Sequence, residues 1–342
     1  MRSLLAVYTV SLMGCSEPEP RPPRVQAPPP AAKGAPAGAK GPSPRAPEVA
    51  EPVVIGLHTG IGFRFKGLAI DPDARTAYLG SWDRKQIVAV DLRDRTHRLI
   101  ATKYSGRLNG MGVYLRHRVL YAVMNEVDDR PGARALSVLL VIDATSHRVL
   151  RAYELRGAGG RHHFNHVVVD RRGIAYVSDT LQSSIYTVDT EKPADRLRLL
   201  IEHKDLALVH GLDLSPDGSV LFSTSYRAGI KFLDLGTLEF SSFGDPATAG
   251  DDGLRYHEGS LYGAGGNAIR RYVLSDAEDA VVRTEVFARD HERFNDPRCL
   301  HIQGGWLYVL ANIELDPVTF RSGRVGSKQR LTDSYVIKYR LP

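Results

Sequence analysis

Cysteine is almost absent from this sequence: 342 residues contain only Cys15 and Cys299. If Cys15 is modified, as the preceding residues Leu12-Met13-Gly14 suggest, no disulfide can form within the chain. Cys299 lies between Arg298 and Leu300 in the alternating pattern of an inner strand, which favours a packed core thiol over a reactive nucleophile. The fold therefore has to be explained without cross-links.

A strong charge of either sign is also lacking. The 45 Lys and Arg residues against 39 Asp and Glu residues give a net charge of +6, spread along the chain. No stretch combines basic residues with interleaved aromatic residues, which a nucleic-acid surface would need. We exclude nucleic acid as a partner and attribute the charge to solubility, with weak attraction to anionic surfaces.

Proline is scarce everywhere except near the N-terminus, where residues 17–52 hold 12 of the 20 prolines. Together with Ala, Gly, Lys and Arg, this composition cannot bury an apolar core. We predict that residues 16–52 form a disordered, partly polyproline tether, which gives reach to the domain that follows.

The first 15 residues carry the marks of an export signal. Arg2 precedes an apolar run that ends at Leu12-Met13-Gly14-Cys15, a sequence that resembles the lipobox of bacterial lipoproteins. We expect lipid on Cys15, membrane anchoring through that lipid, and an extracytoplasmic location. Ser16 favours the periplasmic face of the outer membrane or the cell surface.

A repeated hairpin organises the rest of the chain. Residues 209–224, VHGLDLSPDGSVLFST, show an alternating apolar run, a Ser-Pro-Asp-Gly turn and a second apolar run, which is typical of two antiparallel strands. Five further segments align with this one at a period of about 45 residues. They are 67–81, 109–125, 165–180, 252–266 and 296–312.

Each unit also contains a third apolar run and a weaker fourth run. Four strands in each of six units predict an all-β, six-bladed β-propeller over residues 53–342. The run Val53–His58 is expected to supply the outer strand that the last blade lacks, which would close the ring and remove an exposed edge. Two long excursions, 126–135 and 313–332, are candidates for functional rims.

A polar residue opens the first strand of each unit, whereas the rest of these strands is largely apolar. In a propeller these positions converge at one mouth of the central channel, where a ligand or metal site is expected. Because strand ends lie next to loops exposed to water, they are often polar, and this explains part of the pattern. The six residues are Lys66, Asn109, Asn165, His210, Asp252 and Asp296.

Three of these segments carry a resemblance to a known family. FNHVVVD, HGLDLSPDG and DDGLRYHEG, in this order, resemble the senescence marker protein/gluconolactonase family of six-bladed propellers, with its paraoxonase and strictosidine synthase relatives. The resemblance implies a divalent metal, usually calcium, over the channel and hydrolysis of lactones or esters. Asn165 and Asp252 match the metal-binding positions of that family. His210 replaces an asparagine, and Lys66 replaces a glutamate.

These two replacements leave three hypotheses open. An altered metal site for Ca or Zn would use Asn109, Asn165 and Asp252 with Asp296, and His210 as a ligand or base. A metal-free hydrolase would use His210, oriented by Asp252, as general base and Lys66 to polarise a carbonyl. In the third hypothesis the propeller binds a small molecule, sugar or protein without chemistry.

Two smaller groups of polar residues complete the candidates. His162, His163 and His166 surround the start of one inner strand, and we interpret them chiefly as a solvated rim because alternation separates neighbours. Asp179 and Asn267 end second strands at the same mouth, where they could contact a ligand, although such residues also favour turns. With Trp82 and Trp306 as the only tryptophans, the regular tryptophan pattern expected of a quinone-dependent dehydrogenase propeller is missing.

Overall fold

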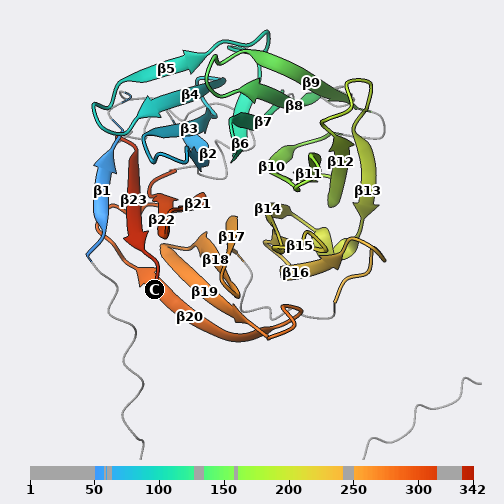
Figure 1. The fold of residues 1–342 in the computed structure, drawn as a ribbon, viewed down its shortest axis with the longest axis vertical. Helices are drawn as coiled ribbons and strands as arrows, with labels where there is room; N and C mark the ends of the chain where they lie inside the picture. Colours follow the sequence, from blue (N-terminus) through green and yellow to red (C-terminus); the bar gives the residue numbers. More distant parts are fainter. Residues whose placement is uncertain are drawn as a thin grey trace, which may run out of the picture. The chain divides into compact units, whose positions relative to one another are not determined.

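The computed structural model describes residues 51–57, 59, 64–126, 135–157, 161–241, 250–313 and 333–342. From β1 onward they form a ring of six antiparallel sheets around a central axis (Figure 1). The ring lies within the second of two compact units, Glu48–Pro342. The predicted six-bladed β-propeller is confirmed.

The strands follow one another from the centre of each blade to its outside. In chain order they are β1 (Val53–Gly56), then β2 (Phe65–Ile70), β3 (Thr76–Ser81), β4 (Gln86–Asp91) and β5 (His97–Ile100), then β6 (Asn109–Arg116), β7 (Val119–Asn125), β8 (Leu136–Asp143) and β9 (Val149–Arg156), then β10 (Phe164–Val169), β11 (Ile174–Asp179), β12 (Ser184–Asp189) and β13 (Arg198–Glu202), then β14 (Val209–Leu214), β15 (Val220–Ser225) and β16 (Gly229–Asp234), then β17 (Gly253–His257), β18 (Ser260–Gly265), β19 (Ala268–Leu274) and β20 (Val281–Arg289), and finally β21 (Leu300–Gln303), β22 (Trp306–Leu310) and β23 (Tyr335–Arg340).

The β14–β15 hairpin forms as its sequence predicts. Leu214 pairs with Leu221, and Gly218 closes the turn with φ of 77°, a conformation that favours glycine. The side chain of Asp217 stabilises the turn because it accepts hydrogen bonds from Ser215 Oγ at 2.6 Å and from Ser219 N at 3.0 Å. In this blade the described residues show three strands and an isolated bridge between Leu233 and Phe240 instead of a full fourth strand.

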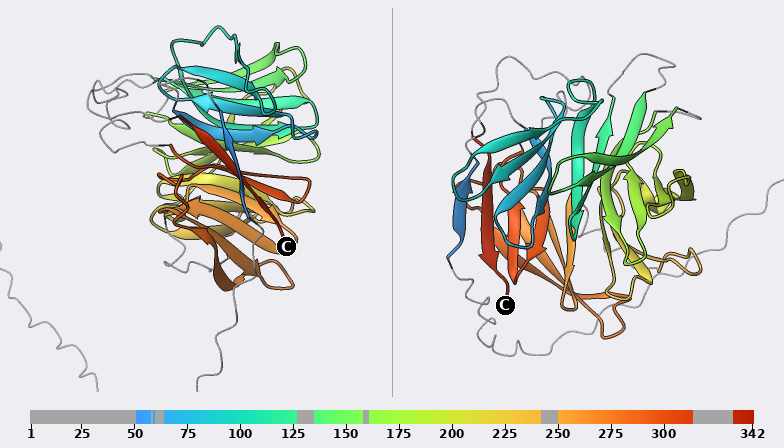
Figure 2. Two further views of the ribbon diagram at one scale, coloured as in Figure 1. Left: turned by 90° about the vertical axis from the view of Figure 1, so that its left-hand side faces the viewer. Right: turned by 45° about the horizontal axis from the view of Figure 1, so that its top comes forward.

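The ring closes through strands from both ends of the domain. β1 pairs antiparallel with β23, from Val53 opposite Lys338 to Gly56 opposite Tyr335, and so becomes the outermost strand of the last blade. Figure 2 shows β1 beside β23 in both views. The predicted closure by the N-terminal run is confirmed.

Apolar side chains fill the space between neighbouring blades. Cys299 illustrates this packing: it is 4% exposed and lies in a cluster with Leu68 and Leu310, which joins the last blade to the first. Its thiol donates to the Lys66 carbonyl oxygen at 2.7 Å, and burial raises its pKa to about 12. The interpretation of Cys299 as a core thiol is confirmed.

Two glycines allow the inner strands of adjacent blades to approach closely. Gly211 and Gly253 directly follow the mouth residues His210 and Asp252. A Cβ on Gly211 would lie 2.5 Å from the Asp252 carbonyl oxygen, and one on Gly253 would collide with the carbonyl of Arg298. Glycine is therefore required here for close backbone contact, and this contact brings the mouth residues of three consecutive blades together.

Several sequence predictions fall on residues outside the described part of the chain. These are the signal segment 1–15 with Cys15, the tether 16–52 up to residue 50, and the excursions 126–135 and 313–332 apart from residues 126, 135 and 313. They remain predictions. Within the described ranges, no helix has the length and apolar character needed to cross a membrane.

Candidate functional site at the channel mouth

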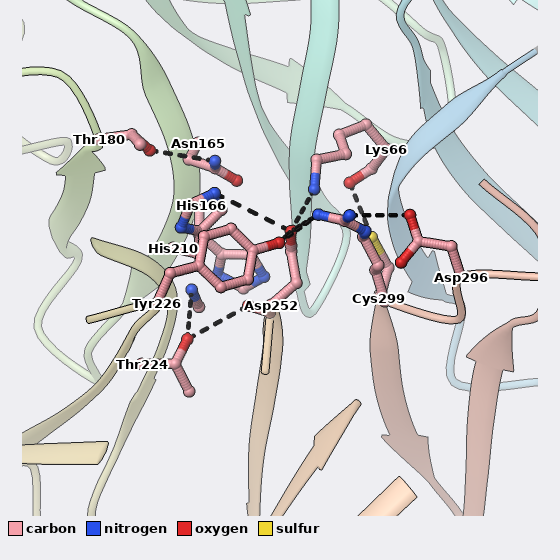
Figure 3. Close-up of polar contacts among 12 residues, drawn as sticks. Lys66, Asn165, His166, Thr180, His210, Thr224, Tyr226, Asp252, Asp296 and Cys299 are labelled. Carbon is pink, nitrogen blue, oxygen red and sulfur yellow. Dashed lines mark hydrogen bonds and ion pairs between the residues drawn. The ribbon is translucent and has the colours of Figure 1, made fainter. Parts of the chain in front are cut away.

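The structure brings three of the six predicted mouth residues into one buried cluster. Lys66, His210 and Asp252 are each at most 4% exposed and point toward a common centre (Figure 3). They come from the starts of three inner strands, β2, β14 and β17, which are far apart in the sequence. Their placement follows from the convergence of inner strands around the ring axis.

Asp252 is the centre of this cluster. Its Oδ2 accepts hydrogen bonds from Lys66 Nζ, from Tyr226 OH at 2.9 Å and from Arg298 Nη1 at 2.9 Å. Arg298 also donates to Tyr226 OH, and its Nη2 pairs with Asp296 Oδ2 at 2.8 Å. Two cations and two carboxylates thus balance one another in a network that contains no surplus formal charge.

The neighbouring cations control the ionisation of Asp252. Burial alone would raise its pKa, but the charges of Lys66 and Arg298 hold it well below its usual range. Burial, followed by the Asp252 charge, raises the pKa of Tyr226. At neutral pH the carboxylate is ionised and Tyr226 retains its proton.

His210 is held in one orientation by the backbone. Its Nδ1 lies 2.7 Å from the Leu208 carbonyl oxygen, which can only accept, so Nδ1 carries the proton. Burial lowers the pKa of His210 to about 4, and the ring is neutral at pH 7 with a lone pair on Nε2. Nε2 lies 4.0 Å from Asp252 Oδ2. Leu208, rather than Asp252 as the metal-free hypothesis expected, therefore orients the imidazole.

Arg298, which is not among the six predicted mouth residues, occupies the mouth position of the last blade. The β17–β18 turn closes on His257 opposite Ser260, and the β21–β22 turn closes on Gln303 opposite Trp306. The residue five positions before His257 is Asp252, and the residue five positions before Gln303 is Arg298. The alignment that equated Asp252 with Asp296 was therefore wrong by two residues, because it matched the aspartates instead of the turns.

Tyr226 was also missed, because it lies after a second strand rather than before a first one. It follows β15, and its ring lies 4.1 Å from the His210 ring and 5.7 Å from the Arg298 guanidinium carbon. Its position one residue beyond Ser225, at the same end as His210, was the available signal. Tyr226 forms part of the wall against which His210 packs.

The two asparagines of the predicted site bond to the strand ends around them. Asn165 Nδ2 donates to Thr180 Oγ1 at 3.1 Å, and Thr180 donates onward to the Val209 carbonyl at 2.8 Å. Asn109 Nδ2 donates to the Trp82 carbonyl at 2.6 Å. Neither amide makes a described bond to Asp252, so the structure does not join them to the cluster.

The remaining candidates, Asp179 and Asn267, make structural contacts. Asp179 is fully buried, with His162 Nδ1 at 2.7 Å from its Oδ2 and the His163 amide donating to its Oδ1 at 2.9 Å. Asn267 adopts φ of 58° and accepts from the Asp296 amide at 3.1 Å. His162 and His163 are buried, in contrast to the solvated rim that the sequence suggested.

These residues do not fit a divalent metal. The only carboxylate at the centre of the cluster, Asp252, already binds Lys66 and Arg298 through Oδ2. A dication there would face two positive groups, whereas calcium requires several oxygen ligands with net negative charge. In the part of the chain that the structure describes, no group of three His, Cys, Asp or Glu side chains could hold a metal.

Solved structures of similar fold are numerous. The aldose sugar dehydrogenase of Streptomyces coelicolor in its PQQ-bound form is 16% identical with a TM-score of 0.56, and 86% of this chain and 99% of that one align. The calcium-binding protein regucalcin from Agrobacterium tumefaciens is 16% identical with a TM-score of 0.56, over 85% and 95%. The allergen Mala s 1 of Malassezia sympodialis is 15% identical with a TM-score of 0.60, over 85% and 96%.

These neighbours confirm the propeller fold and are consistent with the family resemblance found in the sequence. At such low identity they carry no substrate or metal to this chain. No family model matches the sequence, and no curated protein matches it.

Proposed function

We propose that the protein binds a small, neutral, oxygen-rich molecule, such as a sugar or lactone, at the channel mouth. The observation that carries the proposal is the pairing of Lys66 and Arg298 with Asp252 and Asp296. Because these charges cancel, the mouth has no surplus charge to attract an ion. It still offers ammonium and guanidinium donors beside the acceptor Nε2 of His210, which suits hydroxyl and carbonyl groups.

We further propose that lipid on Cys15 anchors this binding domain to a membrane outside the cytoplasm, on the periplasmic face of the outer membrane or on the cell surface. The support is the Leu12-Met13-Gly14-Cys15 sequence and the proline-rich segment that separates it from the propeller. The tether would allow the channel mouth to meet its ligand at a distance from the membrane. A protein partner, which would make the propeller an interaction scaffold, is the remaining alternative.

A second candidate function is metal-free hydrolysis of a lactone or ester. One observation favours it: the Leu208 carbonyl fixes the tautomer of His210 so that the lone pair of Nε2 is available to a water molecule. Lys66 Nζ, held by Asp252, would then polarise the substrate carbonyl. The low pKa of His210, about 4, makes it a weak base and favours binding over turnover.

Substitution of His210 by Gln tests both functions. We expect glucose or δ-gluconolactone to raise the melting temperature of the full chain, and His210→Gln to weaken this binding about tenfold, since the Nε2 lone pair that the Leu208 contact holds in place is lost. His257→Gln, at the opposite end of β17, is the matched control and should behave as wild type. Melting curves with added ligand and hydrolysis of δ-gluconolactone and phenyl acetate are measured on all three proteins.

The outcomes separate the two candidates. Binding without turnover supports the first function, and turnover that falls 100-fold or more in His210→Gln supports the second. Equal ligand affinity in His210→Gln and wild type would place the binding site elsewhere. No response to any of these compounds would overturn the assignment to neutral sugars and lactones.

A further inference from the structure

Below the mouth cluster, a buried arginine lies in the channel without a matching carboxylate. Arg255, on β17, is 5% exposed, and its Nη1 donates to the carbonyl oxygens of Leu254 at 2.7 Å and Leu212 at 3.3 Å. Its Nε and Nη2 are buried and make no hydrogen bond within the described residues. Burial of a guanidinium with two unsatisfied hydrogen-bond donors lowers the stability of the fold unless another group pairs with it.

The nearest acidic side chain does not neutralise this arginine. Asp213, on β14, uses Oδ1 to accept from the Leu214 amide at 3.0 Å and Oδ2 to accept from the Tyr256 amide at 2.7 Å. Every nitrogen of Arg255 lies more than 4.0 Å from the oxygens of Asp213, so the two side chains do not form an ion pair. Backbone amides bind both oxygens, and Arg255 acts on Asp213 without touching it: its charge opposes the rise that burial causes in the Asp213 pKa.

Two buried histidines on other inner strands, His166 on β10 and His301 on β21, lie near enough for the Arg255 charge to lower the pKa of their rings in addition to burial. The Leu212 amide donates to His166 Nδ1 at 3.4 Å, which assigns the ring proton of neutral His166 to Nε2. His301, 8% exposed, has both ring nitrogens buried and unpartnered among the described residues. Arg255 is the charged group that acts most strongly on both rings, and burial keeps the pKa of each below its ordinary value.

We propose that Arg255, His166 and His301 form an anion-binding site inside the central channel, separate from the neutral mouth cluster. The ligand is a small anion, either an inorganic ion or the carboxylate of an organic acid. Arg255 Nε and Nη2, the Nε2–H of His166 and one ring N–H of His301 are available as donors, and Arg255 carries a full positive charge. Ordered water could satisfy the idle hydrogen bonds but would leave the buried charge unpaired, so an anion explains more of the arrangement.

The test measures how anions change the melting temperature of the full chain. Protein dialysed against Tris–HEPES buffer is titrated with chloride, phosphate or acetate, which distinguishes inorganic from carboxylate ligands. An anion at a hundred times its Kd should raise the melting temperature by about 5 °C. Arg255→Met should abolish the rise, and Arg283→Gln, on the outer strand β20 with a 63% exposed side chain, should preserve it.

A second variant covers the case in which Arg255→Met does not fold. Arg255→Lys keeps the charge but loses the Nε and Nη2 geometry, and it should bind the anion at least tenfold more weakly by titration calorimetry. A rise of equal size in wild type and the Arg255 variants would show a general salt effect and overturn the site. Absence of a rise with all three anions would overturn it as well, and a water-filled channel would remain.

Discussion

Replacement of Asp252 by Asn is expected to lower the free energy of unfolding by about 3–5 kcal/mol, because it leaves buried cations without their shared carboxylate. The Lys66 side chain is 1% exposed and has no other ion-pair partner among the described residues, whereas Arg298 retains Asp296. An uncompensated ammonium at this depth cannot be solvated. Urea unfolding of the full chain measures the loss.

The matched control is Asp296→Asn, which removes the other carboxylate bound to Arg298. Asp296 is 29% exposed, so water can replace its contact and the expected loss is below about 1 kcal/mol. In the double variant Lys66→Met, Asp252→Leu, much of the stability lost in Asp252→Asn should return, since the buried ammonium is removed with its partner. A loss below 1 kcal/mol in Asp252→Asn would contradict the central role of Asp252.

Acidification from pH 6.5 to pH 5 is expected to destabilise the propeller by several kcal/mol through its buried histidines. Burial lowers the pKa of His163 and His210 to about 4 and that of His301 to about 3. In the unfolded chain each ionises near pH 6.5, so the unfolded state binds more protons in this interval. Each histidine then contributes about 2 kcal/mol of lost stability at pH 5.

The direction follows from the depressed pKa values. The stability that the neutral histidines provide is fully present above pH 6.5. It is lost as the pH falls toward 4, where the folded protein also binds the protons. Asp251 opposes part of the change, because burial raises its pKa to about 6 and its protonation favours the folded state between pH 6 and 4. Urea unfolding at pH 5, 6.5 and 8 measures the net change in the free energy of unfolding. Equal stability at pH 5 and pH 6.5 would contradict the neutral, buried state of these rings.

Most of the fold was available from the sequence, because hairpin turns and apolar alternation repeat along the chain. The turn at Gly218 and the pairing of Val53–Gly56 with β23 depend on local chemistry and on the need to cover an edge, and both were predicted. The outer strands gave a weaker signal. In the described part, the blade of β14 shows three strands and an isolated bridge.

The contacts within the candidate site were less accessible than its location. Convergence at the mouth placed Lys66, His210 and Asp252 near one another, but periodicity does not show which side chains will pair. The two-residue offset that hid Arg298 came from matching the aspartates of the two segments, although their turns are alike: Glu258 and Gly259, and Gly304 and Gly305, all have positive φ. Arg255 escaped notice because a lone arginine in a strand resembles a surface residue until its burial is known.

The metal content of the mouth tests the account most directly. The full chain, stripped of metal with a chelator, is titrated with calcium and with zinc in a calorimeter, beside Asp252→Asn. The pairing of Lys66 and Arg298 with Asp252 predicts no one-to-one binding that depends on Asp252. Stoichiometric binding in wild type that disappears in Asp252→Asn would show that the carboxylate serves a metal and would contradict the account.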